Sequence, residues 1–193
     1  MIEPFQFQFG HDWISMHFPL WEKFILPHKE VIKHILEIGC YEGRSSVWFL
    51  EHFPEAELAA IDNFEGDDDL KRNKIDFSET KKRWVHNTSP WEIRTELMVE
   101  ESSVHIPELI SIGEMFDLIL VDGDHSAQGC LTDLVLSWQV LNPRGFMIID
   151  DYLWGNGRPA LDTPEPAVEA FLRIFARQIE MIHMDYQVII RKK

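Results

Sequence analysis

Short apolar runs alternate with amphipathic stretches from residue 31 to the end of the chain, and this alternation limits the possible folds more than any other feature. A helix between two strands returns the chain to the end of the sheet where the first strand began, so the two strands run parallel. The pattern therefore predicts an α/β fold with a Rossmann-like, doubly wound sheet that is mainly parallel and carries helices on both faces.

The positions of the elements follow from the length and spacing of the apolar runs. Strands are predicted at 32–38, 58–62, 96–100, 116–122, 145–150, 179–183 and 186–191, and helices at 43–53, 77–87, 103–112, 127–141 and 166–177. Only Met184 and Asp185 separate the last two strands, too few residues for a helical crossover, so an antiparallel hairpin at the sheet edge is predicted. Residues 63–76 lack periodicity and are predicted to form a polar loop.

The chain is expected to form one domain. Its 193 residues are 45% hydrophobic, which is enough for one core. We place that domain at 31–193 and treat residues 1–30 as a separate aromatic segment, interrupted by Pro4, Pro19 and Pro27. This segment is predicted to be a lid or an oligomer contact, so a homo-oligomer is one expectation.

Composition argues against several classes of protein. A formal net charge of −15 would repel nucleic acid. No apolar run reaches the roughly 18 residues that a membrane-spanning helix needs, and no basic flank precedes an apolar stretch at the N-terminus. Cys40 and Cys130 have no metal-type spacing and are interpreted as reduced core thiols. The expectation is a cytoplasmic protein that acts on a small molecule.

Residues 34–46, HILEIGCYEGRSS, are predicted to form a buried strand, a glycine turn and the start of a helix. Gly39 permits a backbone conformation barred to residues with a Cβ atom, and Gly43 lets the helix approach a ligand closely. The N–H groups at the helix start favour a polar or anionic group. Glu37 stands where the dinucleotide fingerprint Gly-x-Gly-x-x-Gly has its first glycine, and a carboxylate there suits a cationic ligand better than a pyrophosphate.

Acidic residues end most of the predicted strands, at the edge where open α/β sheets bind ligands. Asp62 ends the second strand, 23 residues after Gly39, which is the spacing of an acid that binds ribose hydroxyls. Residues 100–102, Glu-Glu-Ser, end the third strand where an adenine edge would lie. The fourth strand ends in Asp-Gly-Asp-His at 122–125, and the fifth in Asp-Asp at 150–151.

The fourth and fifth strands are expected to be neighbours about 4.8 Å apart, which brings Asp122, Asp124, Asp150 and Asp151 together. Carboxylates that close cannot all stay ionised unless a cation neutralises them or their pKa values rise. All-oxygen ligation points to Mg²⁺, Mn²⁺ or Ca²⁺ rather than zinc. If both Asp150 and Asp151 bind the metal, the strand must already have ended. An acidic rim that faces a cationic ligand without metal is the alternative.

Four segments in this order, residues 36–46, 61–64, 116–125 and 148–152, resemble the class I S-adenosylmethionine-dependent methyltransferases. Within that superfamily the chain is most similar to the methyltransferase domain 24 group, which is related to the macrocin-type and catechol-type metal-dependent O-methyltransferases. The likeness covers residues 31–193. It implies a seven-stranded sheet in the order 3-2-1-4-5-7-6 and S-adenosylmethionine as the cofactor.

The resemblance also implies a role for each matching residue. Those assigned to the cofactor are Glu37, Gly39, Tyr41 and Gly43 at its methionine part, Asp62 at the ribose, Ser102 at the adenine, and Asp122. Asp122, Asp150 and Asp151 match the metal ligands of the macrocin-like enzymes, with Mg²⁺ as the expected metal, and Asp124 matches their proposed general base. Asp151 stands where catechol-type enzymes have Asn, and their lysine near the fourth strand is missing here. These departures argue against catechol substrates and leave His125 as a second candidate base.

The predicted reaction is methyl transfer to a hydroxyl oxygen of a small molecule, such as a sugar or natural product. A metal that bridges two substrate oxygens would lower the pKa of one hydroxyl, and Asp124 or His125 would take its proton. Both residues could instead be turn or capping residues, and Asp62 a helix N-cap. An NAD-dependent oxidoreductase is disfavoured, because neither its glycine fingerprint nor a catalytic Tyr-Lys pair is present. A metal-independent methyltransferase and a non-catalytic cofactor-binding or scaffold protein remain open.

Overall fold

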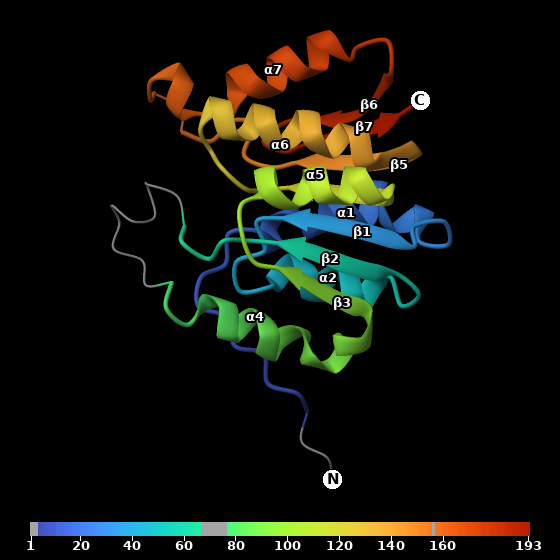
Figure 1. Ribbon diagram of the computed structural model, residues 1–193, viewed down its shortest axis with the longest axis vertical. Helices are drawn as coiled ribbons and strands as arrows, with labels where there is room; N and C mark the ends of the chain where they lie inside the picture. The colour runs from blue at the N-terminus through green and yellow to red at the C-terminus, as the bar shows by residue number, and fades with distance from the viewer. Residues whose placement is uncertain (1–3, 67–76, 156) are drawn as a thin grey trace.

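A seven-stranded sheet in the order β3-β2-β1-β4-β5-β7-β6 forms the centre of the computed structural model, which describes residues 4–66, 77–155 and 157–193 (Figure 1). The strands are β1 (His34–Ile38), β2 (Glu57–Ile61), β3 (Thr95–Met98), β4 (Phe116–Val121), β5 (Leu141–Ile149), β6 (Ile179–Met184) and β7 (Val188–Lys192). Strands β1 to β5 are parallel, whereas β7 is antiparallel to both β5 and β6. The predicted fold class, strand order and C-terminal hairpin are therefore confirmed.

Helices cover both faces of the sheet because successive strand residues point to opposite sides. Leu36 and Ile38 of β1 join a core with α5 (Ser102–Ile112), α6 (Ala127–Val140) and α7 (Glu165–Ile174). Ile35 joins the core of the other face, with α1 (Phe18–Phe24) and α2 (Arg44–His52). Cys40 and Cys130 are buried free thiols, as predicted. Within the described residues, no helix has the length and apolar character that crossing a membrane requires.

The N-terminal segment packs against other parts of the same chain. Two hydrogen bonds join Gln8 to Asn87 of α4 (Thr80–Thr88). The Gln8 backbone N–H donates to Asn87 Oδ1 at 2.7 Å, and Asn87 Nδ2 donates to the Gln8 carbonyl oxygen at 3.0 Å. After the short helices η1 (Ser15–His17) and α1, the chain passes through η2 (Leu26–His28) into β1. Trp21 of α1 is fully buried, and its indole Nε1 donates to Gln187 Oε1 at 2.9 Å. Ile14, Trp21 and Ile25 are thus part of the core, and the roles of the segment as lid or oligomer contact stay predictions.

Several element bounds differ from the predicted ones. Strand β5 begins at Leu141, four residues before the predicted start at 145, because Leu141 still pairs with Phe116 across a register shift. Helix α4 begins at Thr80 instead of 77. Two further short helices, η3 (Ser89–Arg94) and η4 (Ala160–Asp162), follow α4 and β5. Residues 67–76 of the predicted polar loop, and position 156, lie outside the described residues.

Candidate active site

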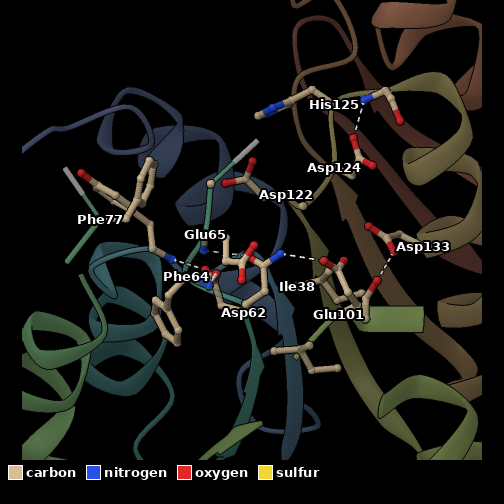
Figure 2. A pocket seen from close by; sticks show the side chains of 18 of the residues that line it. Ile38, Asp62, Phe64, Glu65, Phe77, Glu101, Asp122, Asp124, His125 and Asp133 are labelled. Atoms are coloured by element: carbon tan, nitrogen blue, oxygen red, sulfur yellow. Dashed lines mark hydrogen bonds between the residues drawn. The ribbon is translucent and has the colours of Figure 1, made fainter. Parts of the chain in front are cut away.

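A cavity of ≈ 530 Å³ opens at the carboxyl ends of the parallel strands. Its lining comes from the segments that follow β1 to β5 and from Trp13 of the N-terminal segment. Figure 2 shows acidic side chains from three of these segments facing the same space, with Asp62 and Glu101 on one side and Asp122 and Asp124 on the other. This is the edge of the sheet at which the sequence predicted ligand binding.

The glycine turn after β1 forms one wall of the cavity. Gly39 has φ +81°, and a Cβ atom there would lie 1.8 Å from the backbone oxygen of Asp122, so a side chain is excluded. Tyr41, at φ 47°, lines the cavity, and its ring lies 4.9 Å from that of Trp13. Gly43 has φ +81° at the start of α2, but its Cβ position is 2.9 Å from Trp84 Cδ1. The close approach at Gly43 is therefore to Trp84.

Glu37 lies beneath the glycine turn and is fully buried. Its carboxylate accepts hydrogen bonds from the hydroxyls of Ser45 and Ser46 in the first turn of α2. Burial raises the pKa of Glu37 to about 7, against the lowering effect of the two hydroxyls. Glu37 is not among the described residues that line the cavity, so its contact with a cofactor stays a prediction. Its hydrogen bonds with Ser45 and Ser46 connect β1 to α2.

Asp62, the predicted ribose acid, lines the cavity and also holds two turns in place. Its Oδ2 accepts hydrogen bonds from the backbone nitrogens of Cys40 at 2.9 Å and Tyr41 at 2.8 Å. Its Oδ1 accepts from Phe64 N at 2.6 Å. Burial raises the pKa of Asp62, while the three N–H donors oppose that rise. A carboxylate oxygen has two acceptor sites, so a ribose hydroxyl could still bind.

The predicted adenine end of the cavity contains a partly buried pair. The Ser102 hydroxyl donates to the carboxylate of Asp133, a residue of α6 whose pKa burial raises to about 6. Beside it, Asn63 Nδ2 donates to Glu101 Oε1 at 2.8 Å (Figure 2). The sequence reasoning named Ser102 but missed Asp133. The sequence feature that could have indicated Asp133 is an acid on the buried face of α6, which it shares with Cys130, Leu134, Ser137 and Trp138.

Asp122, His125 and Asp151 form a compact group in which one donor atom from each lies within 4.8 Å of the others. Burial raises the pKa of Asp122 well above its ordinary value, and the nearby Asp150 and Asp151 carboxylates add to this rise. His125 Nε2 lies 2.6 Å from Asp151 Oδ2, and the His125 ring stacks on Trp154 at 4.7 Å. The crowding of acids predicted between the fourth and fifth strands is thus present, with an imidazole among them.

Asp150 lies beside this group. Its Oδ1 accepts the Asp151 backbone N–H at 2.7 Å and lies 4.0 Å from His17 Nε2. Burial and the adjacent Asp151 charge raise the pKa of Asp150 to about 7. Strand β5 ends at Ile149 and Asp151 has φ 58°, so the chain turns as joint metal binding by the two aspartates requires. Asp150 as a metal ligand stays a prediction.

Asp124 is exposed at the rim of the cavity, at the start of α6. Its Oδ1 accepts the Ser126 backbone N–H at 2.7 Å, and a Cβ atom at Gly129 would lie 2.0 Å from its Oδ2. The Ser126 hydroxyl in turn accepts from Gly129 N at 3.0 Å, which caps the helix. Asp124 therefore has the geometry of a turn residue, as one alternative held, while it also faces the ligand space.

The donor set of the compact group fits a divalent cation. Two carboxylates supply the hard oxygen ligands that Mg²⁺ and Mn²⁺ prefer, and the imidazole widens the choice to softer divalent metals. A bound cation would also offset the repulsion from Asp150 and Asp151, which adds to the effect of burial on the pKa of Asp122. The sequence predicted ligation by oxygen atoms alone, whereas this group combines two carboxylates with an imidazole nitrogen. Which of these side chains bind a metal stays a prediction.

A family profile described as a methyltransferase domain, Methyltransf_24, matches residues 36–152, more than half of the chain. The chain belongs to this methyltransferase family. The match contains the glycine turn, Asp62, the Ser102–Asp133 pair and all three members of the compact group. The predicted class, an S-adenosylmethionine-dependent methyltransferase, is confirmed, whereas the individual site residues are not tested by this match.

Solved structures of O-methyltransferases share this fold, and one further relative is similar in sequence. An O-methyltransferase from Bacillus cereus, in complex with SAH, superposes with a TM-score of 0.70 at 14% identity, over 95% of this chain and 84% of that one. MycE of the mycinamycin biosynthetic pathway, in complex with Mg, SAH and mycinamycin VI, gives 0.66 at 14% identity, over 94% and 50%. The uncharacterized protein R132 of Acanthamoeba polyphaga mimivirus is 24% identical over 71% of this methyltransferase chain, which spans 59% of R132.

Proposed function

We propose that this methyltransferase transfers the methyl group of S-adenosylmethionine to a hydroxyl oxygen of a small molecule, with the help of a divalent cation. One observation carries the proposal: the glycine turn, Asp62, Asp122 and His125 border a single cavity, and a carboxylate oxygen of Asp151 lies within 4.8 Å of donor atoms of Asp122 and His125. The solved structures with bound SAH and Mg support this choice of cofactor and metal by their fold.

The chain's own residues would orient the two reactants. The backbone of the glycine turn and Asp62 would hold the cofactor, whose sulfonium would supply the methyl group. Alignment of the acceptor oxygen with that group would supply much of the rate. A divalent cation at Asp122, His125 and Asp151 would lower the pKa of the acceptor hydroxyl. Asp124 is the candidate base, because both residues line the cavity but the imidazole of His125 is engaged by Asp151.

Calorimetry can test the two halves of this function separately. Titration of SAH into the full chain should show binding, and a following titration of MgCl₂ should show a second event that Asp122→Asn abolishes. Absence of SAH binding would reject the enzyme function. SAH binding without any metal event would leave a metal-independent methyltransferase.

Turnover needs an acceptor, which a small-molecule library with labelled S-adenosylmethionine can supply. With an acceptor in hand, Asp124→Asn should lower kcat by about 10²–10⁴-fold with little loss of SAH affinity. His125→Gln is the matched comparison from the same loop. A normal kcat in Asp124→Asn together with a large loss in His125→Gln would transfer the role of base to His125.

A further inference from the structure

Tyr186 touches the candidate metal group from outside the cavity. It lies in the turn between β6 and β7, beyond the residues that match the family, and it is not among the described residues that line the cavity. Its hydroxyl nevertheless donates a hydrogen bond of 2.8 Å to Asp151 Oδ1. This contact joins the C-terminal hairpin to the centre of the site.

The Tyr186 side chain is itself held in place. Its ring stacks on that of His17 from the N-terminal segment, with centroids 5.6 Å apart and an interplanar angle of 14°. Its backbone oxygen accepts the Tyr152 N–H at 3.0 Å, which fixes the hairpin turn against the end of β5. The phenol therefore has a defined position behind the site, and side-chain entropy does not have to be lost when it binds Asp151.

The two oxygens of Asp151 have different partners. Oδ1 accepts from the Tyr186 hydroxyl, and Oδ2 lies 2.6 Å from His125 Nε2. The backbone of Asp151 has φ 58°, a conformation that is uncommon for residues other than glycine, although Asp tolerates it better than most. In the wild type, rotation of the Asp151 carboxylate away from His125 would break its hydrogen bond with Tyr186. Without the phenol hydroxyl, this rotation would lose only the contact with His125.

We propose that Tyr186 is a positioning residue of the methyl-transfer site: its hydroxyl fixes the Asp151 carboxylate so that Asp151 presents one oxygen to the group formed with Asp122 and His125. Hydrogen bonds from outer residues orient metal-binding carboxylates and commonly decide metal affinity. The effect on metal binding rests on the function proposed above, whereas the effect on the Asp151 side chain does not.

The test compares Tyr186→Phe with Tyr152→Phe, which removes the same hydroxyl from the neighbour of Asp151 in sequence. Crystal structures of the wild type and both variants report the Asp151 carboxylate directly. Titration with MnCl₂, monitored through the EPR signal of free Mn²⁺, measures metal affinity. Calorimetry with SAH measures cofactor binding, and thermal unfolding measures the stability of the fold.

In Tyr186→Phe, Asp151 should lose its contact with His125, and Mn²⁺ affinity should fall by about 10–100-fold, with unchanged SAH affinity. Tyr152→Phe should keep both properties. An Asp151 carboxylate in the same position in all three crystal structures would overturn the proposal, as would equal Mn²⁺ affinity in the two variants. If the wild type binds SAH but no Mn²⁺, the metal part of the proposed function fails, and the crystal structures still decide the role of Tyr186.

Discussion

The Asp62 carboxylate accepts a hydrogen bond from the backbone N–H of Tyr41, with 2.8 Å between Oδ2 and the nitrogen. The end of β2 thereby holds the glycine turn that follows β1. Since Asp62 also lines the cavity, one side chain both shapes the turn and borders the ligand space. Loss of this carboxylate should therefore affect stability and cofactor binding together.

Asp62→Ala should lower the free energy of unfolding by about 3 kcal/mol, because three backbone N–H groups lose a charged acceptor. SAH affinity should fall at least about tenfold if the turn opens. Urea denaturation and calorimetry measure the two effects. The control is Asp12→Ala, which removes an exposed carboxylate that accepts the Ser15 N–H and pairs with Arg44, and it should cost about 1 kcal/mol or less. Equal losses in both variants would contradict this role of Asp62.

Gly39→Ala should abolish SAH binding, because its Cβ atom would collide with the Asp122 backbone oxygen 1.8 Å away. Gly113→Ala is the matched control: Gly113 has φ +75°, close to the +81° of Gly39, but no atom lies within 4 Å of its Cβ position. The control should cost only the backbone strain, about 1–2 kcal/mol. Urea denaturation and SAH calorimetry of the two variants separate the collision from the strain. Retained SAH affinity in Gly39→Ala would show that the turn can rearrange.

The buried Glu37 should make stability depend on pH. Burial raises its pKa from 4.5 to about 7, so between these pH values the folded protein holds a proton that the unfolded chain has lost. The free energy of unfolding should therefore fall as pH rises from 4.5 to 7, by about 3 kcal/mol for this group alone. Asp133 and Asp150, with pKa values raised to about 6 and about 7, act in the same direction.

Glu37→Gln should reduce this slope, because the glutamine does not ionise while its amide can still bond to Ser45 and Ser46. Urea denaturation at pH 5, 6 and 7 measures it. Glu57→Gln serves as the control, since Glu57 is exposed at the start of β2. Identical slopes in wild type and Glu37→Gln would mean that Glu37 stays ionised in the folded protein.

The sequence predicted the sheet well because its central strands are buried on both faces and contain continuous apolar runs, such as residues 118–121. Chain direction then followed from the length of each connection, including the two residues before the final hairpin. The start of β5 was missed because Pro143 and Gly145 are typical of loops, although Leu141 pairs with Phe116 before them.

The candidate site was predictable where residues follow strands in the sequence, as Asp62, Asp122 and Asp151 do. Partners that reach the site from elsewhere leave no such pattern. Tyr186 comes from a hairpin turn and His17 from the N-terminal segment, and only the tertiary fold brings them to Asp151 and Asp150. Asp150 and Asp151 occupy different positions because the backbone turns at Asp151, where φ is 58°. The sequence Asp-Asp does not indicate such a turn.

Trp13 offers a test of the N-terminal segment as a lid. It lines the cavity against Tyr41 although its side chain is 46% exposed, and Arg44 near it pairs with Asp12 at 3.5 Å. Trp13→Ala should weaken SAH or acceptor binding by about 0.5–1.5 kcal/mol, the usual worth of an aromatic contact, with little change in unfolding free energy. Met16→Ala, at a 77% exposed position of the same segment, is the control. Calorimetry measures binding, and sedimentation the oligomeric state. Unchanged binding with a shift in sedimentation would assign Trp13 to an oligomer contact instead, because a lid residue acts within one chain.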